Sequence, residues 1–415
     1  MKRVRRVLIA LRRDERGVVL ILVLMALVVL GALSATLLTI GRTEVQIAAN
    51  HLRSTRAHFL AEAGVEDAFN AFRTTSSLVS SAPGTLTAVP GLAGPGPTLA
   101  AVGSYTVQYQ SAGPDTVLVV STGTSGTGGA QKLIRATMTT AWVINYAIVT
   151  NGDLTVSGNV TVDGDCGGSH SNGNLTVSGS VDLSADATAS GTFSTSGSPS
   201  IGGISGGGFP DEPIPNIDPA DFLAAAKSTL PADQVFQMKS DGQILDGNDN
   251  VIATLSSGDT FQGWTYQSAP SVNWSLSGNT GYDGTYYFEG NIDVSGSPGS
   301  STTPWQTTLI ATGDIVLSGG PDISAHLTNT LFVAGLDMKI TGNPGASTGL
   351  VAAHEQVQIA GNPTITGSVV AQNAASTSNT VNQPELSLSG NPTITYVCGM
   401  VPPIRGPLQI LAWGL

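Results

Sequence analysis

The sequence is poor in charge, in cysteine and, over most of its length, in basic residues. Only 11% of the 415 residues are charged, and two are cysteine. After residue 135 the basic residues are Lys227, Lys239, Lys339 and Arg405. Nucleic acids and anionic lipids are bound through clustered Lys and Arg, so this composition argues against both as partners of the long acidic part.

The same shortage argues against an enzyme. Sites that cleave polysaccharides need carboxylates converging on one face, often with Lys or Arg to stabilise developing negative charge. No acidic pair repeats in such a pattern, and the five histidines show no HExxH or other ligand spacing. The loop 163–174 has Asp163 and Asp165, but Asn174 stands where a calcium loop needs a bidentate acid. We expect no catalytic residue, no metal and no cofactor.

The two cysteines, Cys166 and Cys398, belong to neither a CxxC motif nor a zinc-ligand pattern. In an oxidising compartment they form a candidate disulfide. In an elongated fold, residues so far apart in sequence would instead lie far apart in space. The sequence leaves both arrangements open.

What the sequence does have is a long apolar run behind a basic leader. Residues 18–40 carry no charge, and a helix of this length rises about 35 Å, enough to cross a hydrocarbon core of about 30 Å. Seven of the 17 basic residues precede this run, against two of the 29 acidic residues. The excess of basic residues predicts an N-terminus on the cytoplasmic side of a membrane, with the remaining chain outside the cytoplasm.

Residues 41–73 contain no proline and predict a continuation of the same helix. Apolar residues recur here mostly three or four positions apart, which predicts one stripe half-buried against the rest of the chain. The stripe comprises Val45, Ala48, Leu52, Phe59, Ala63, Val65, Ala68 and Phe72. A continuous helix over 18–73 would be about 84 Å long.

Four features together resemble the N-terminal region of the PilX family of type IV pilus minor pilins. They are a basic leader ending in Arg16-Gly17, an apolar helix that starts at once, the stretch TEVQIAAN, and the stretch HFLAEAGVEDA at 58–68. The resemblance implies cleavage by a prepilin peptidase between Gly17 and Val18, which keeps the apolar helix in the mature protein. It also implies that the helix packs with other pilins. The residues it places in that packing are Leu22, Glu44, Glu62 and Gly64.

One position departs from the major pilins. The fifth residue of the mature chain is Leu22, where major pilins typically have a glutamate that pairs with a neighbour's terminal amine. Without that carboxylate, residence in the bilayer costs less free energy, but docking below another subunit loses a charge contact. Its absence is common in PilX-like proteins and in GspK pseudopilins, which the resemblance places at or near filament tips. A minor or tip subunit is therefore favoured over a bulk fibre subunit.

After a linker rich in Pro, Gly and small residues, three short stretches predict β-strands. They are GSYTVQYQ at 103–110, TVLVVSTG at 116–123 and KLIRATMTT at 132–140. Three antiparallel strands would cover the apolar stripe of the helix. Together they form a small pilin-like α+β module.

A unit of about 20 residues recurs from residue 143 onward. Each copy has a short alternating strand, a Ser-Gly or Gly-Asn-Pro corner and a second strand, as in GDLTVSGNVTVDGD and VQIAGNPTITGSVVA. Strands too short to bury a face alone, repeated at this period, predict a parallel β-solenoid with turns about 4.8 Å apart. An antiparallel β-sandwich is the alternative architecture.

Residues 206–283 interrupt the repeat. They predict a Pro-rich crossing, one short helix with Asp218 as its N-cap, and a hairpin about DGNDN at 246–250. Large aromatic residues gather at 264–288. Two interpretations stay open for Trp264, Trp274 and Tyr286: packing inside the insertion, or exposed contacts to a sugar or a partner protein.

The predicted fold class is mainly β, with a long N-terminal α-helix, a small α+β module and a parallel β-solenoid that carries a helix-containing insertion. The predicted segments are a leader at 1–17, the helix at 18–73, the linker and three-stranded module at 74–142, the first solenoid part at 143–205, the insertion at 206–283 and the second solenoid part at 284–415.

The predicted function is that of a minor pilin or pseudopilin-like structural protein, anchored in the inner membrane through residues 18–40 before it reaches the periplasm or cell surface. Its expected partners are a prepilin peptidase and other pilins, with adhesion to a surface polysaccharide or host protein through the solenoid. Two alternatives remain: a membrane-anchored surface solenoid that binds polysaccharide or protein, and a carbohydrate-active enzyme on the same scaffold.

Overall fold

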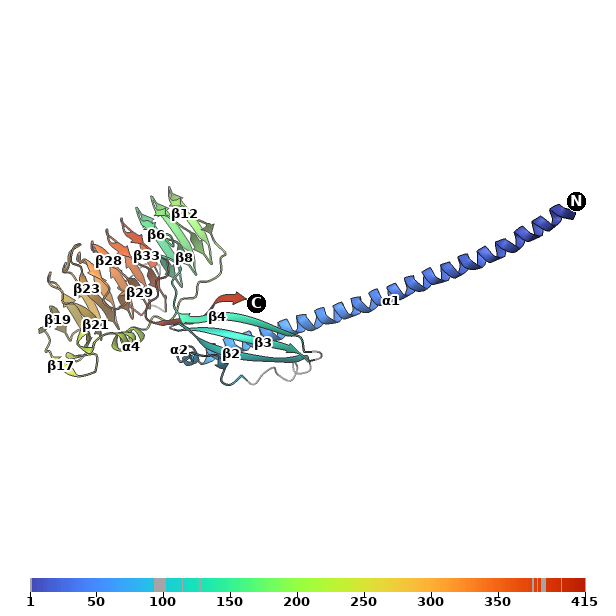
Figure 1. Ribbon diagram of the computed structural model, residues 1–415. Coiled ribbons are helices and arrows are strands. Elements are labelled where there is room, and N and C mark those ends of the chain that lie inside the picture. Colours follow the sequence, from blue (N-terminus) through green and yellow to red (C-terminus); the bar gives the residue numbers. More distant parts are fainter. Residues whose placement is uncertain are drawn as a thin grey trace. The chain divides into compact units, whose positions relative to one another are not determined.

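A computed structural model describes residues 2–92, 102–113, 115–126, 129–374, 377–378, 380–381, 386–396 and 398–414, with side chains from Val19 onward. The chain forms two compact units. The helix unit comprises Met1–Thr139 and Ile410–Leu415, and the solenoid unit comprises Thr140–Gln409. Figure 1 labels the elements of both units.

The helix unit is built on α1 (Lys2–Thr74), a single helix of 73 residues. Its apolar segment contains Ser34, Thr36 and Thr39, whose hydroxyls donate to carbonyl oxygens four residues earlier at 2.7–2.9 Å. Each polar group of this segment is thereby satisfied inside the helix, as a hydrocarbon environment requires. A second helix, α2 (Ser77–Ser80), follows at once.

A five-stranded sheet, in the order β1-β2-β3-β4-β35, lies mostly in the helix unit; Thr140–Ala141 of β4 and Arg405–Gln409 of β35 belong to the solenoid unit. The strands are β1 (Thr87–Ala88), β2 (Gly103–Gly113), β3 (Thr116–Ser125), β4 (Gln131–Ala141) and β35 (Arg405–Gly414). β1 to β4 pair antiparallel. The three predicted strands correspond to β2, β3 and β4, and the edge strands β1 and β35 were not predicted.

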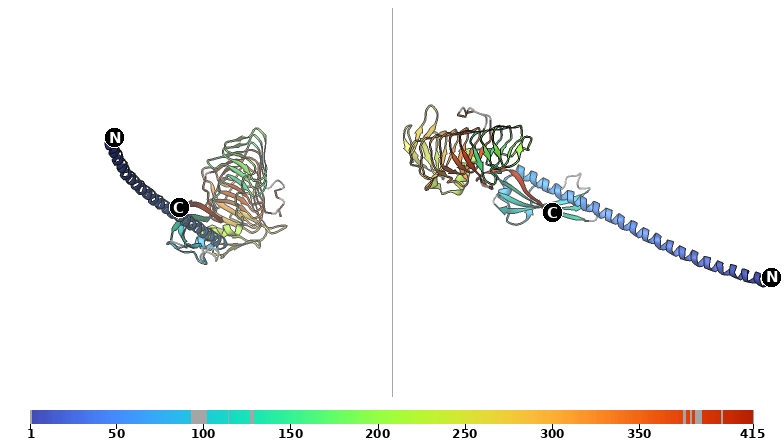
Figure 2. Two further views of the ribbon diagram at one scale, coloured as in Figure 1. Left: turned by 90° about the vertical axis from the view of Figure 1, so that its right-hand side faces the viewer. Right: turned by 90° about the horizontal axis from the view of Figure 1, so that it is seen from above.

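The solenoid unit is a parallel stack of short strands, which Figure 2 shows as successive rungs. Its first part contains β5 (Ile148–Thr150), β6 (Leu154–Gly158), β7 (Thr161–Asp163), β8 (Ser169–Ser171), β9 (Leu175–Gly179), β10 (Asp182–Leu183), β11 (Ala187–Ala189), β12 (Phe193–Gly197), β13 (Ser200–Ile201) and β14 (Ser205–Gly206). Equivalent strands of successive turns pair in parallel and in register, as β6 does with β9. The predicted mainly β class with a parallel solenoid is confirmed, and the β-sandwich alternative is wrong.

The second part supplies the remaining turns. Its strands are β20 (Asn273–Leu276), β21 (Gly284–Phe288), β22 (Asn291–Val294), β23 (Trp305–Ala311), β24 (Ile315–Leu317), β25 (Ile323–Ser324), β26 (Thr330–Ala334), β27 (Met338–Ile340), β28 (Ala346–Thr348), β29 (Leu350–Ala353), β30 (Val357–Ile359), β31 (Thr364–Thr366), β32 (Val369–Ala371), β33 (Leu386–Leu388) and β34 (Thr393–Thr395). One face runs as an 11-stranded sheet in the order β12-β9-β6-β33-β30-β27-β24-β22-β20, followed by β19 (Trp264–Gln267) and β18 (Thr260–Phe261).

The segment between the two parts contains helices, hairpins and further solenoid strands. It contains α4 (Pro219–Thr229), the 3-10 helix η1 (Ala232–Gln234), and strands β15 (Val235–Met238), β16 (Gln243–Leu245), β17 (Val251–Thr254), β18 (Thr260–Phe261) and β19 (Trp264–Gln267). The predicted helix and hairpin are present, with Asp218 Oδ1 accepting from Ala220 N at 2.9 Å. β15 pairs in parallel with β21, so this segment also builds solenoid.

The two solenoid parts stack in the reverse of their order along the chain. β5, β6 and β7 pair with β32, β33 and β34, so the first turn in sequence lies on the last. Chain entry and exit therefore meet in the middle of the stack. The crossing that leaves β14 returns along the solenoid to β15.

Repeated corners turn the chain between faces. Side-chain hydrogen bonds of 2.8–3.0 Å form a ladder through Asn343, Asn362 and Asn391 of the Gly-Asn-Pro corners and on to Asn159, which follows Gly158, so that the ladder continues across the joint between the parts. Gly179, which is in register with Gly158 of the neighbouring turn, has φ +94°, and a Cβ there would lie 2.6 Å from the carbonyl oxygen of Gly158. Only glycine fits where the backbone has this conformation and turns approach this closely.

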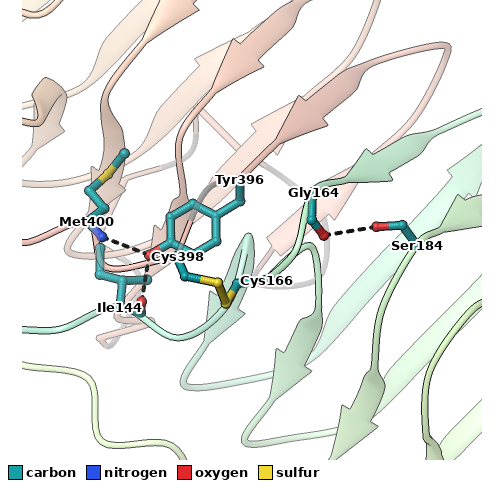
Figure 3. The surroundings of a disulfide bond; sticks show 7 residues. All are labelled: Ile144, Gly164, Cys166, Ser184, Tyr396, Cys398 and Met400. Atoms are coloured by element: carbon teal, nitrogen blue, oxygen red, sulfur yellow. Dashed lines mark hydrogen bonds between the residues drawn. A yellow bond between two sulfur atoms is a disulfide. The ribbon is translucent and has the colours of Figure 1, made fainter.

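A disulfide between Cys166 and Cys398 spans the joint (Figure 3). Their Cα atoms are 5.2 Å apart, although the residues are 232 positions apart in sequence. Beside it, the buried Tyr396 donates from Oη to the carbonyl oxygen of Ile144 at 2.5 Å. Of the two arrangements left open by the sequence, the structure has the paired one, because reversed stacking places the ends of the two parts together.

Candidate functional site

The apolar part of α1 is uncovered along its whole described length. From Val19 to Ile40, large apolar side chains are 48–68% exposed, and Leu22 is 61% exposed. The segment is long and apolar enough to cross a membrane. Burying each such side chain is worth about 1.5–3 kcal/mol, so this surface requires a bilayer or other helices around it.

Further along α1, one face packs on the sheet of the same unit. The buried residues of this face are Ala57, Leu60, Ala61, Gly64, Val65, Ala68 and Phe72. Small residues let the backbones approach closely: a Cβ on Gly64 would lie 2.3 Å from Ser121 Oγ on β3. The prediction that Gly64 packs in a filament is wrong, because the chain's own sheet lies directly against Gly64.

A second apolar row lies on the opposite face of α1. Val45 is 70% exposed, Leu52 50% and Phe59 62%. Positions seven apart lie about 20° apart around a helix, so these three form one row. Ala57 and Ala61 are two residues to either side of Phe59 and therefore point away from it. The single half-buried stripe predicted from the sequence is thus wrong: Val65, Ala68 and Phe72 belong to the buried face, and the row of Val45, Leu52 and Phe59 is unpartnered among the described residues.

Two further predicted packing residues lie on or beside this uncovered surface. Glu44 is exposed. Glu62 is partly exposed and its Oε1 lies 3.2 Å from His58 Nε2, one helical turn earlier. Both remain free to meet a partner helix, with the His58 contact limiting the rotamers of Glu62. The backbone of α1 also runs through the predicted cleavage junction of Gly17 and Val18.

A side-chain hydrogen bond joins α1 to the sheet of the same unit. Tyr105 on β2 donates from Oη to Asp67 Oδ2 on α1, and Tyr105 is 5% exposed. Burial, followed by this hydrogen bond and the nearby negative charge, raises the pKa of Tyr105 to about 12. Phe72 packs near Tyr109, with ring centroids 5.4 Å apart. These contacts orient the helix so that the row through Phe59 faces away from the sheet.

The three aromatic residues considered for ligand contacts lie in the core of the solenoid unit. Trp264, Trp274 and Tyr286 are each 0% exposed, and Trp264 packs on Phe288 with ring centroids 4.6 Å apart. Burial raises the pKa of Tyr286 well above its ordinary value. The ligand-contact interpretation of these three residues is wrong, because they belong to the buried core.

The polar residues considered for metal binding are also used in the fold. Asp163 Oδ1 accepts from Gly164 N at 2.7 Å, and buried His170 contacts Thr188 and Asn172 through its two ring nitrogens. Burial lowers the pKa of His170. Within the described ranges, no three His, Cys, Asp or Glu side chains gather as metal ligands would.

One cavity of about 300 Å³ lies in the solenoid unit beside the start of α4. Its lining includes Asp218, Thr312 and His354. Asp218 caps α4, and His354 Nδ1 contacts Gln372 Oε1 at 2.8 Å. The polar groups in this cavity therefore serve the fold, and no pair of carboxylates converges there.

No protein-family model matches the chain, and no curated protein sequence matches it. Among solved structures, it is similar to the competence-associated pilin ComZ from Thermus thermophilus. The match has 14% sequence identity, covers 87% of this chain and 97% of that chain, and has a TM-score of 0.34. Similarity at this level leaves the function to be argued from the chain's own residues.

Proposed function

We propose that this protein is a minor pilin or pseudopilin-like subunit of a type IV pilus system. It is made as a prepilin, cut between Gly17 and Val18, held in the inner membrane by residues 18–40, and assembled with other pilins through α1. The observation that carries the proposal is the exposure of α1. Its apolar segment is exposed on all sides, and further along the helix one face packs on the chain's own sheet while the opposite face presents an exposed apolar row.

A bilayer alone does not account for all of the uncovered surface. Arg42 and Glu44 are charged and exposed, and they separate the apolar segment from the row of Val45, Leu52 and Phe59. Charged side chains mark the boundary of a hydrocarbon core, so this row lies beyond it. Packing against helices of other pilins would bury the row.

Leu22 supports a minor or tip position. A subunit without a carboxylate at this position has no charge partner to offer the terminal amine of a neighbour. We propose that it joins a filament by apolar packing and displays its solenoid outward. The role is structural, with adhesion through the solenoid surface as its second part and no reaction catalysed. A screen of the full chain against acidic and neutral polysaccharides should release no sugar; measurable turnover would contradict this role.

The assembly step is tested by placing a charge on the uncovered row. Leu52→Lys and Phe59→Lys should still fold and insert, because neither side chain contacts the sheet. They should enter sheared filaments at least about tenfold less than wild type, since a lysine buried against another helix costs more than about 1.4 kcal/mol.

Asn50→Lys is the matched control. Asn50 is exposed in the same stretch of α1 but points away from Leu52. It adds the same charge to the same part of the helix and should assemble normally. Filament levels of Leu52→Lys equal to those of Asn50→Lys would contradict assembly through this row and would favour a membrane-anchored solenoid that works outside a filament.

A further inference from the structure

The two ends of the solenoid are built differently. At one end β15, β16 and β17 form an antiparallel meander, and β18, β19 and β20 form another, so the stack closes on hairpins. At the other end the stack stops at the turn made of β12, β13 and β14 (Figure 1). We call this turn, residues 193–206, the open end.

The open end presents an unpaired strand edge above the apolar core. β12 pairs with β9 along its full length without a register shift, from Phe193 opposite Leu175 to Gly197 opposite Gly179. Its other edge has no partner strand among the described residues. Ser194 to Gly197 are exposed, while Leu175 and Val177 directly beneath are 0% exposed.

The usual protections of an edge strand are missing here. Edge strands are normally shielded by charged side chains, by proline, by a bulge or by a covering segment. β12 contains neither charge nor proline, and residues 187–210 contain no charged residue at all. The inward-facing Phe193 and the nearby Ile201 are only partly buried against the core. Terminal turns of repeat proteins need a polar cap or a partner for this reason.

We propose that the open end is an interface and that it is occupied by the open end of a second copy of this chain. The chain has a net charge of −12, so most contacts between copies bring negative charges together. The uncharged open end avoids that repulsion. A partner of opposite charge would gain no attraction there, which favours a copy over a basic protein.

Antiparallel pairing of β12 with its copy is self-complementary. A two-fold axis at Thr195 places Ser194 opposite Ser196 and Phe193 opposite Gly197. A phenylalanine ring across from a strand glycine covers the exposed backbone, an arrangement known to stabilise sheet edges. The same surface serves both copies, as a closed two-fold dimer requires. This inference stands independently of the pilin assignment.

Cross-linking of the full chain in detergent micelles tests the geometry. Thr195→Cys places two thiols across the axis, where Cα atoms of directly opposed antiparallel residues are about 4.5–5.5 Å apart, within disulfide reach. The native cysteines are paired with each other, so the introduced thiol is the reactive one. Thr195→Cys should give a disulfide-linked dimer on mild oxidation.

Thr176→Cys is the matched control, because Thr176 is also exposed but lies on β9, one turn inside the stack and facing sideways. It should stay unlinked. Equal cross-linking at the two positions would overturn the proposal, as it would show random collision.

A second variant removes dependence on cysteine chemistry. Thr195→Glu puts two like charges at the axis, and should raise the dimer dissociation constant at least tenfold while leaving circular dichroism unchanged. The mass of the full chain in micelles, measured by light scattering over a dilution series, gives this constant. A monomeric wild type, or a dimer that Thr195→Glu leaves intact, would overturn the proposal.

Discussion

Removing the Cys166–Cys398 disulfide is expected to weaken the solenoid at one place, the joint between its first and last turns. The bond joins residues 232 positions apart. For a loop longer than 100 residues, the chain entropy removed from the unfolded state amounts to about 5 kcal/mol, and native disulfides typically contribute about 2–5 kcal/mol. The double variant Cys166→Ser/Cys398→Ser should therefore lose about 2–5 kcal/mol of unfolding free energy.

The effect should be local because no continuous backbone connects the two turns at the joint. Other neighbouring turns are connected directly by the chain, whereas β5, β6 and β7 are held on β32, β33 and β34 by hydrogen bonds, packing and this one bond. Tyr396 bonded to the carbonyl oxygen of Ile144 remains in the variant. We expect the strands on both sides of the joint to open first.

Denaturant unfolding measures the loss of unfolding free energy, and amide hydrogen exchange shows where the solenoid opens. Urea titration followed by tryptophan fluorescence gives the change in unfolding free energy, and exchange rates locate it. Wild type reduced with dithiothreitol is the control, since it differs only in the sulfur–sulfur bond and should behave like the double variant. An unchanged unfolding midpoint, or exchange that rises evenly along the whole solenoid, would refute the reasoning.

Two further predictions concern single residues. Gly179→Ala should destabilise the solenoid by more than about 1 kcal/mol, because the alanine would need a positive φ and its Cβ would lie 2.6 Å from the Gly158 carbonyl oxygen. Thermal unfolding measures this loss of stability, and an unchanged melting temperature would contradict the corner geometry. Tyr105→Phe should remove a pH dependence. A pKa raised to about 12 favours the neutral phenol in the folded state, so wild type loses stability as the pH rises from about 10 to 12, and the variant should lose less; equal slopes in urea titrations across this window would contradict the Asp67 contact.

The repeat itself could be predicted from the sequence, but the order of its turns could not. Strand period and Gly-Asn-Pro corners predict a solenoid, because short strands bury a face only by stacking. Leu154 and Leu386 occupy equivalent positions of similar units, so nothing local indicates that the first stacks on the second. Cys166 and Cys398 meet only because the first turn stacks on the last, so the sequence could not predict their pairing either.

The helix shows a related limit. Periodicity reveals apolar positions but does not say which of two apolar faces the sheet covers. The informative signal was the small residues Ala57, Ala61 and Gly64, since only a face without bulky side chains admits a sheet so closely. Residue size along a helix face was therefore a better guide than hydrophobicity. For Trp264 and its neighbours, aromatic clustering does not distinguish core from surface, and burial decides it.

The most direct test of the proposed pilin role is the N-terminus of the mature protein. Protein isolated from cell membranes and from sheared filaments should be sequenced from its N-terminus and its intact mass measured. Processing by a prepilin peptidase predicts a chain that begins at Val18 and keeps the whole apolar segment. A chain that begins at Met1 in both fractions would contradict it.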